Sequence, residues 1–420
     1  MNTLVVQKYG GTSVGSIELI KKVAERIARM RKTGLDIIVV VSAMAGQTDK
    51  LLDMAQQINP NAKHREIDLL LSSGERISSA LLTIALDNIG CPSISMTGRQ
   101  IGLLTDNSHT RARIKEIDTE RARRILKKKH VIVVAGFQGI NEHGDVTTLG
   151  RGGSDTSAVA LAVALNAERC EIYTDVDGVY IADPNVVPGA QKMDRVSYDE
   201  MLEMASLGAK VLQFRCVEFC KKYNMPLIVK SSLIDDSIGT LICEEDSTME
   251  QPVVSGIMSD INQAKITIKG VPDQPGIASK FFTGLADENL SVDMIIQNVS
   301  EEGHTDISFT VTKEDINEAT AIVNKLGKLI GTREISSDSD ICKVSIVGAG
   351  MRSHPGVAAK MFSALSEENI NIVMISTSEI RVSCIIDEKY GELAVRVLHK
   401  VFNVNEDKEK NELNNGAQTA

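Results

Sequence analysis

The order of apolar and polar positions divides the chain into two parts. From residue 1 to about 245, short runs rich in β-branched residues alternate with longer stretches of helical periodicity. The runs predicted to be strands are 3–7, 36–43, 92–97, 131–137, 170–175 and 226–232. Several of these runs are apolar on both faces, which is typical of parallel strands covered by helices on both sides. The pattern therefore predicts a three-layer α/β domain with a mostly parallel central sheet.

The second part of the chain repeats itself. Residues 275–295 align with residues 355–375 at an offset of 80, and a strand of alternating pattern precedes each copy. Each copy reads as a strand, a Pro-Gly turn, a helix and another strand. Two copies are too few for a solenoid, so we expect a pair of small α/β modules, at 261–335 and 336–404, that pack on one another.

Polar segments mark the boundaries of these parts. We place the first domain at 1–245, followed by a segment at 246–260 that joins it to the modules. The short strand at 253–258 within this segment fits either module. Residues 405–420 lack apolar periodicity, so we predict that this tail is disordered.

Composition narrows the class of partner. The chain has 420 residues, an aromatic share of 3%, no Trp and a formal net charge of −10. Few aromatic side chains can stack on bases and the charge opposes a polyanion, so we expect no nucleic-acid partner. No apolar run approaches the length of a membrane span, and the N-terminus lacks the pattern of a signal peptide, so we expect no membrane partner.

The cysteines indicate the compartment. The chain has seven of them, an odd number at irregular spacings, which fits no disulfide framework. Free thiols in a chain of this size are typical of a reducing compartment, so we predict a cytoplasmic protein.

Residues suited to binding an anion follow the ends of two predicted strands. The first strand is followed by Lys8, Gly10 and Gly11, and the strand at 131–137 leads, after a turn, to the stretch 151–155, which reads RGGSD. In a parallel sheet, ligands bind beyond the carboxyl ends of the strands, close to helix N-termini. Glycine lets backbone N–H groups approach an anion, and a cation at each junction would neutralise it. Each glycine pair alone is also consistent with a tight turn, but together they indicate an anion site.

Other chemistries lack their motifs. No G-x-G-x-x-G follows a strand, which disfavours nicotinamide and flavin cofactors. His64, His109, His130 and His143 lie in polar segments without a spaced partner, so we expect them to be exposed. Without a protein metal cage, the compatible metal is Mg²⁺ carried in on a nucleotide, and phosphoryl transfer is the favoured reaction class.

Five motifs occur together in one order: KYGGTSVG at 8–15, VVSAM at 40–44, SSGER at 72–76, TLGRGGSDTSA at 148–158 and YTDVDGVYIADP at 173–184. With the paired C-terminal modules, this set resembles the aspartate kinase family. The resemblance covers the chain from residue 3 to about 404. It implies an amino-acid-kinase fold with a mostly parallel central sheet, followed by two ferredoxin-like ACT modules.

The resemblance also implies an activity. This would be the ATP-dependent phosphorylation of the side-chain carboxylate of L-aspartate to 4-phospho-L-aspartate, the first step towards lysine, threonine and methionine, with Mg²⁺ bound to ATP. Lysine, threonine or both would inhibit by binding the ACT modules, which would also join chains into a homodimer or larger oligomer. The alternatives are another carboxylate kinase of the same fold and a catalytically silent amino-acid sensor.

Site residues are carried over from the family motifs. The resemblance assigns catalysis to Lys8 and Asp155. It assigns phosphate binding to Lys8, Gly10, Gly11, Thr12 and Ser13. It assigns aspartate binding to Ser42, Thr48, Glu75, Arg151, Gly152 and Ser154. It assigns ATP binding to Thr174, Asp175, Tyr180, Asp183, Pro184, Lys210 and Val211. It assigns effector binding to Asp273, Gly276, Ala278, Gln297, Asn298, Ser378 and Glu379. From the residues alone, Glu75 could instead be a carboxylate that favours a helix N-terminus, and Gln297 a plain edge-strand residue.

Overall fold

The computed structural model describes residues 3–208, 211–235, 237–245, 253–288, 290–298 and 303–402. The chain forms two units, one made of Met1–Val179 with Lys192–Thr248 and the other of Tyr180–Gln191 with Met249–Ala420. After the resemblance given above, we call them the kinase unit and the regulatory unit, and we describe each by itself. The predicted tail at 405–420 and the first part of the predicted 246–260 segment lie outside the described residues.

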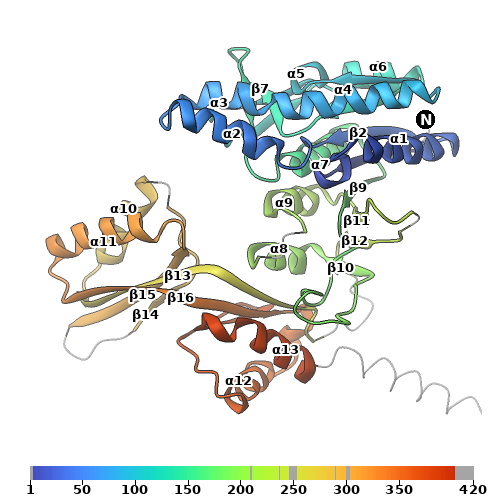
Figure 1. Ribbon diagram of the computed structural model, residues 1–420. Coiled ribbons are helices and arrows are strands. Elements are labelled where there is room, and N and C mark those ends of the chain that lie inside the picture. Colours follow the sequence, from blue (N-terminus) through green and yellow to red (C-terminus); the bar gives the residue numbers. More distant parts are fainter. Residues whose placement is uncertain are drawn as a thin grey trace, which may run out of the picture. The chain divides into compact units, whose positions relative to one another are not determined.

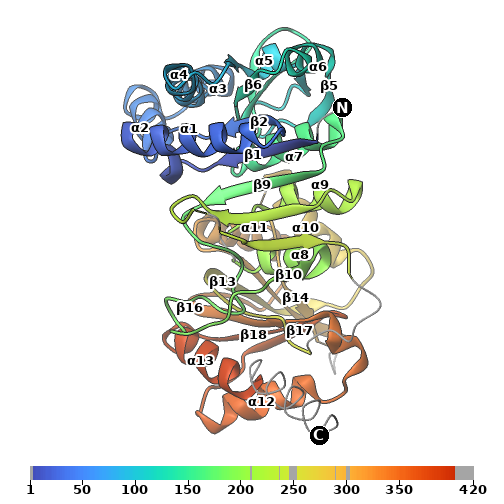
Figure 2. The ribbon, with the colours of Figure 1, turned by 90° about the vertical axis from the view of Figure 1, so that its right-hand side faces the viewer.

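An eight-stranded sheet forms the centre of the kinase unit, in the order β10-β12-β11-β9-β1-β2-β6-β3. The six runs predicted from the sequence are all strands: β1 (Leu4–Tyr9), β2 (Asp36–Val41), β3 (Ser93–Met96), β6 (Val131–Ala135), β9 (Arg169–Thr174) and β11 (Leu227–Ser231). They are parallel to their neighbours within this set. Figure 2 shows β9, β1 and β2 side by side. The sheet is completed by β10 (Arg195–Ser197) and β12 (Thr240–Cys243), of which β12 is antiparallel to β11.

Helices cover both faces of this sheet, as the apolar runs predicted. On one face, α1 (Ile17–Lys32) and α4 (Ser73–Asn88) share a buried core with β1 and β2. On the other, α7 (Gly153–Leu165) packs against β1, β2 and β9 and is almost wholly buried. The remaining helices are α2 (Gln47–Ile58), α3 (His64–Leu71), α5 (Gly98–Ile101), α6 (Glu120–Lys127), α8 (Tyr198–Ser206), α9 (Phe214–Tyr223) and the 3₁₀ turn η1 (Thr12–Val14).

A second, four-stranded sheet of the kinase unit was not predicted. Its order is β5-β4-β7-β8, with β4 (Leu103–Thr105), β5 (Ile114–Ile117), β7 (Gln138–Ile140) and β8 (Val146–Thr148). Strands of three or four residues carry little periodic signal: of the strands this short in the described part of the kinase unit, the sequence predicted β3 and missed β4, β5, β7, β8, β10 and β12.

One stretch of the kinase unit is apolar enough to span a membrane, contrary to the prediction that none approaches this length. It is 64–88, which contains α3 and α4. It carries the carboxylates of Asp68 and Glu75, both buried in the unit. Because α4 packs against α1 and β6, we interpret the stretch as core helices rather than a membrane span.

The regulatory unit is built on one six-stranded sheet, in the order β14-β15-β13-β16-β18-β17. Its strands are β13 (Gly256–Pro272), β14 (Ile295–Gln297), β15 (His304–Thr312), β16 (Glu334–Val347), β17 (Met374–Thr377) and β18 (Arg381–Asp387). The repeat predicted two modules packed on one another. Instead the long strands β13 and β16 pair along most of their length and join both modules into one sheet. Residues 256–260 pair with 343–347, so this end of β13 belongs to the sheet of the second module.

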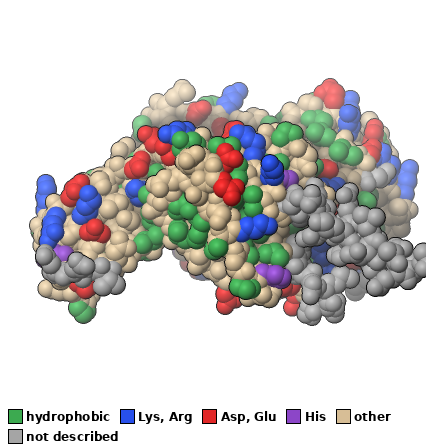
Figure 3. All heavy atoms as spheres, turned by 90° about the horizontal axis from the view of Figure 1, so that it is seen from below, with side chains coloured by type: hydrophobic (Ala, Val, Ile, Leu, Met, Phe, Trp, Pro, Cys, Tyr) green, Lys and Arg blue, Asp and Glu red, His purple; other side chains and the backbone are tan. Residues whose placement is uncertain are grey.

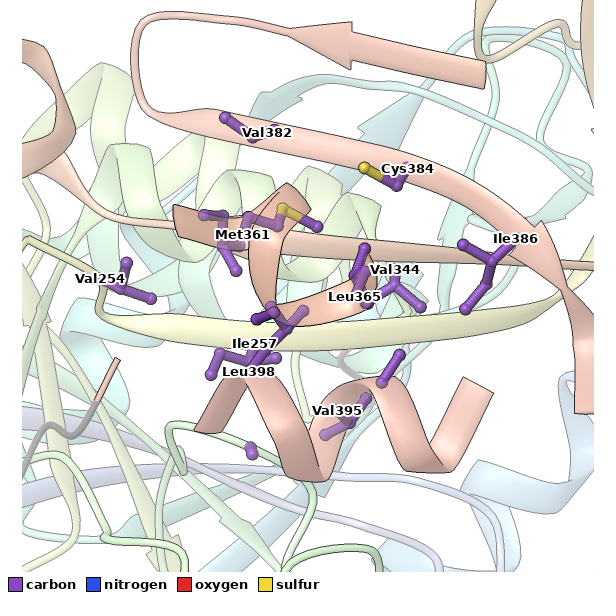
Figure 4. Close-up of a cluster of buried hydrophobic side chains, with 14 of the residues drawn as sticks. Val254, Ile257, Val344, Met361, Leu365, Val382, Cys384, Ile386, Val395 and Leu398 are labelled. Atoms are coloured by element: carbon purple, nitrogen blue, oxygen red, sulfur yellow. The ribbon is translucent and has the colours of Figure 1, made fainter. Parts of the chain in front are cut away.

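Each module keeps its own helices and core. Figure 1 shows α10 (Ile277–Asp287) and α11 (Ile316–Ile330) on one side of the sheet and α12 (Val357–Glu367) and α13 (Gly391–Phe402) on the other. Two 3₁₀ turns, η2 (Ala349–Ser353) and η3 (Glu388–Tyr390), complete the second module. Figure 4 shows Met361 and Leu365 of α12 and Leu398 of α13 packed against the sheet residues Ile257 and Val344. Where side chains are coloured by type in Figure 3, acidic and basic side chains intermingle.

Residues 180–191, which interrupt the kinase unit in the sequence, complete the second module. Ala182, Val187 and Ala190 are buried in the same core as α12 and α13, and Ile257 N donates to Ile181 O at 2.7 Å. The chain thus leaves the kinase unit after Val179 and returns at Lys192. The predicted first domain, an uninterrupted stretch from 1 to 245, did not include this excursion.

Candidate active site and effector site

The carboxyl edge of the large sheet brings together a cation and a carboxylate. Lys8 is the penultimate residue of β1, and Asp155 lies in the first turn of α7. Lys8 Nζ is 2.7 Å from Asp155 Oδ1, and the two side chains are 12% and 9% exposed. The approach lacks hydrogen-bond geometry, so the contact is an ion pair. These are the two residues to which the sequence analysis assigned catalysis.

The glycine turn after β1 packs closely, which corrects one expected role. Gly10 N donates to Tyr173 O at 3.0 Å, so this N–H group is engaged within the protein and is not free to bind phosphate. Gly11 lies against Ala43, because a Cβ atom at this position would be 2.8 Å from Ala43 O. Thr12 is exposed, whereas Ser13 is buried with its Oγ 3.5 Å from Tyr173 O.

The second glycine turn forms the N-terminus of α7. Gly152 is the N-cap with φ +67°, and a Cβ atom there would lie 1.7 Å from Cγ of Gln213. Only glycine fits this backbone conformation and this space. Ser154 is buried and lies close to Gly136. A Cβ atom added to Gly136 would be 3.0 Å from the Cβ atom of Ser154. Arg151 is exposed and forms no ion pair with any residue of the described ranges.

Glu75 is a buried carboxylate with one oxygen unused. Its side chain lies in the first turn of α4, and the residue is 3% exposed. Oε1 accepts the N–H of Ala43 at 3.1 Å, whereas Oε2 has no hydrogen-bond partner among the described residues. Burial raises the pKa of Glu75 to about 7. A buried carboxylate oxygen without a donor is costly, so the site is suited to a cationic ligand group.

The remaining residues predicted to bind aspartate lie near the same edge. Ser42 directly follows β2, and its N–H donates to Tyr9 O at 3.1 Å. Gly74 brings the start of α4 against Ala43, because a Cβ atom there would be 2.7 Å from Ala43 Cβ. Thr48 lies in the first turn of α2 and is half-buried. Lys8, Ser42 and Glu75 are thus connected through β1, β2 and Ala43.

The residues predicted to bind ATP are divided between the two units. Thr174 ends β9 and the exposed Asp175 follows it, and Thr174 Oγ1 donates to Asp175 Oδ1 at 3.1 Å. Tyr180, Asp183 and Pro184 belong to the regulatory unit, where Asp183 and Pro184 are exposed. Val211 is half-buried. Lys210 lies outside the described residues.

The first module contains a cavity of about 310 Å³ around its Pro-Gly turn. Four of the residues predicted to bind an effector line it: Asp273, Gly276, Ala278 and Gln297. Asn298 is not among the lining residues, and its N–H donates to Asp306 O in the sheet. Ser378 and Glu379 form the turn after β17 and do not line the cavity. Glu379 is exposed, 3.4 Å from Arg352 Nε.

A buried polar cluster near the loop that carries Arg151 was not predicted from the sequence. His109 was expected to be exposed, which is wrong: its Nδ1 lies 2.7 Å from Oδ2 of Asp68, whose side chain is fully buried. Nothing local links them, because they are 41 residues apart. The available signal was Asp68 itself, which shares the apolar stripe of α3 with Leu71.

Comparisons with known proteins decide the family. Residues 3–231 match the amino acid kinase family, and residues 265–331 and 344–402 each match the ACT domain. An aspartate kinase of Pseudomonas putida is 54% identical over 402 residues, which cover 96% of this chain and 98% of that relative. The chain belongs to the aspartate kinase family.

Solved structures of this family share the fold. Escherichia coli aspartokinase III in complex with aspartate and ADP, in its R-state, gives a TM-score of 0.78 at 27% identity and covers 95% of this chain and 99% of that chain. The same enzyme in complex with lysine and aspartate, in its T-state, gives 0.73 at 26% identity, with 96% and 100% covered. The family, the enzyme class and the kinase fold with two ACT modules are therefore confirmed.

Proposed function

We propose that the chain transfers the γ-phosphoryl group of MgATP to the side-chain carboxylate of L-aspartate, forming 4-phospho-L-aspartate. The observation that carries the proposal is the buried Glu75 carboxylate, whose unpaired Oε2 lies at the sheet edge that also holds Lys8 and Asp155. An α-ammonium group would supply the missing donor. Arg151, exposed and without an ion pair in the described ranges, is available for a substrate carboxylate through its bidentate fork.

The chemistry needs cations more than it needs a base. The acceptor carboxylate of aspartate is ionised at neutral pH, so no general base has to activate it. Two anions must meet, and the ammonium group of Lys8 reduces their repulsion and the charge that develops on the phosphoryl group. Asp155 holds that ammonium group in place. In-line positioning by the surrounding loops supplies the rest.

Magnesium fits this site as a companion of the nucleotide. Among the described residues, no group of three or more His, Cys, Asp or Glu side chains is arranged to hold a metal ion. Asp155 is the carboxylate at the sheet edge that could contact Mg²⁺ or one of its waters. The ion would neutralise charge on the phosphates of ATP, which would supply most of its ligands.

The regulatory unit suits feedback inhibition by an end-product amino acid, for which we propose lysine, threonine or both. The cavity lined by Asp273 and Gln297 offers a carboxylate and an amide of the kind that recognise an amino acid. The E. coli relative was solved with lysine in its T-state. We further propose a homodimer or larger oligomer through the ACT modules, a role in lysine, threonine and methionine biosynthesis, and a cytoplasmic location, which the seven free cysteines support.

Turnover of MgATP with L-aspartate, trapped as the hydroxamate, tests this function. Lys8→Ala should abolish turnover, and lysine and threonine, added singly and together, should identify the effector. An exposed lysine on α1 provides the matched control, Lys22→Ala. Folded protein without aspartate-dependent turnover would contradict the proposal and direct attention to other carboxylate acceptors.

A further inference from the structure

Asp68 accepts hydrogen bonds from three groups that lie far from it in the sequence. Its Oδ1 accepts the hydroxyl of Thr148 at 2.5 Å, and both oxygens accept the N–H of Thr110, at 3.0 and 3.1 Å. Its Oδ2 is 2.7 Å from Nδ1 of His109. The residue is 0% exposed. A carboxylate is rarely buried so fully unless its position matters, because losing water is costly even when the group is paired.

The partners of Asp68 determine the start of the loop that carries Arg151. Thr148 ends β8 and leads directly into this loop, residues 149–152. The segment of Thr110 runs beside it, since Ala112 N donates to Thr148 O at 2.9 Å. Thr110 O also lies 3.1 Å from the position that a Cβ on Gly150 would take, so this carbonyl contacts the loop backbone. Asp68 therefore binds the residue at which the loop begins and the neighbouring segment that contacts the loop.

Arg215 of α9 also holds this loop through hydrogen bonds. Arg215 donates through Nη1 to Leu149 O at 2.7 Å and through Nη2 to Ala112 O at 3.2 Å. The loop itself has little intrinsic rigidity, because Gly150 and Gly152 both have positive φ, at +78° and +67°. Glycine-rich backbone of this kind is ordered only by contacts from outside.

We propose that Asp68 is a positioning residue for substrate, acting through Thr148 and Thr110 on the loop that presents Arg151 to the carboxylate of aspartate. This inference rests on the proposed role of Arg151. Asp68 itself touches no reacting atom. Its hydrogen bonds fix where the loop leaves β8, and hence where the guanidinium group stands when aspartate binds.

The experiment uses the full chain with Asp68→Asn and the milder Thr148→Val, which removes one hydroxyl at nearly constant volume. Each should raise the KM for aspartate about tenfold, as expected for a displaced binding group, while the KM for MgATP and kcat stay within about twofold. Glu66→Gln, an exposed acid on the same helix, is the matched control and should leave both KM values unchanged. Thermal unfolding of each variant reports whether it is folded.

A double-mutant cycle separates positioning from general damage. Because Asp68 is proposed to act through Arg151, adding Thr148→Val to Arg151→Ala should raise the KM for aspartate no further than Arg151→Ala alone. Additive effects, a parallel rise in the KM for MgATP, or no change with Asp68→Asn and Thr148→Val would overturn the inference and leave the proposed function standing. An unchanged KM for aspartate in Arg151→Ala would instead refute the role of Arg151 and the inference with it.

Discussion

Lys8 Nζ and Asp155 Oδ1 form a nearly buried ion pair of 2.7 Å across the junction between β1 and α7. Removing the cation should affect the transition state more than the ground state, because charge accumulates on the phosphoryl group during transfer. We predict that Lys8→Met lowers kcat by about a hundredfold or more, with a smaller change in the KM for aspartate. The hydroxamate assay under saturating MgATP measures both, and a fall confined to KM would contradict the assigned role.

Asp155→Asn should behave differently from Lys8→Met, since it keeps the ammonium group of Lys8 but removes the ion pair that holds this group in place. We expect an intermediate loss of kcat, and in the double variant no further loss beyond that of Lys8→Met, because both act on the same charge. Steady-state kinetics of the three variants test this. Losses that multiply would show that Asp155 has a role independent of Lys8.

Glu75 should make aspartate binding dependent on pH. Because burial raises its pKa to about 7, the carboxylate loses its charge as the pH falls below that value. The KM for aspartate should then rise about tenfold per pH unit between about pH 7 and 5, if the ionised form binds the ammonium group. The KM measured across this range checks the prediction, and in Glu75→Gln it should be high and flat. A flat profile in the parent protein would exclude Glu75 as the ammonium ligand.

The same residue should lower stability at neutral pH. In the unfolded chain Glu75 ionises near 4.5, whereas the folded protein keeps its proton up to about 7. Between these values the folded state binds more protons, so this residue's contribution to stability falls as the pH rises and stays low above 7. Glu75→Gln should therefore raise the unfolding free energy at pH 8 by up to about 3 kcal/mol, and by little at pH 4.5. Urea unfolding at both pH values decides the matter, and an equal effect at both would contradict it.

Gly152→Ala tests whether the turn before α7 depends on glycine. A Cβ atom there would overlap Gln213, and φ is +67°. We expect a loss of about 1–3 kcal/mol of unfolding free energy and a raised KM for aspartate. Gly144→Ala is the control, since its φ is also positive, at +83°, but no atom lies within 4 Å of the added carbon. Equal losses in both variants would show that backbone strain, rather than the contact with Gln213, sets the effect.

Asp273→Asn tests the effector cavity. It should weaken inhibition by the effective amino acid at least about tenfold, since a charge-assisted contact is lost, and leave uninhibited turnover unchanged. Asp287→Asn, an exposed acid at the other end of α10, is the matched control. Inhibition curves with lysine and threonine measure the change. Unaltered inhibition would place the effector elsewhere.

The sequence predicted six of the eight strands of the large sheet, because each lies in an apolar or β-branched run between turn signals. It missed the short strands β10 and β12 of that sheet and β4, β5, β7 and β8 of the second sheet, and it missed that β13 and β16 run through both modules. Repeats report local similarity, whereas the pairing of Gly256 with Val347 depends on contacts between distant segments.

The site was predictable where a motif lies in one stretch and not where distant segments meet. Lys8 and Asp155 each sit in a glycine-rich junction, and the sheet brings them together. The bond between Gly10 N and Tyr173 O joins two such segments, so sequence reasoning wrongly left this N–H group free for phosphate. Asp68 and His109 were missed for the same reason.

The excursion of residues 180–191 has a consequence for modularity. No single cut in the gene can separate a complete kinase from a complete regulator. A fragment ending between residues 246 and 252 would carry Ala182, Val187 and Ala190 without the core that buries them, and the matching C-terminal fragment would lack part of its own interior. Exchange of regulatory parts between relatives therefore requires two coordinated replacements, one of residues 180–191 and one of the C-terminal modules. These two stretches must be inherited together.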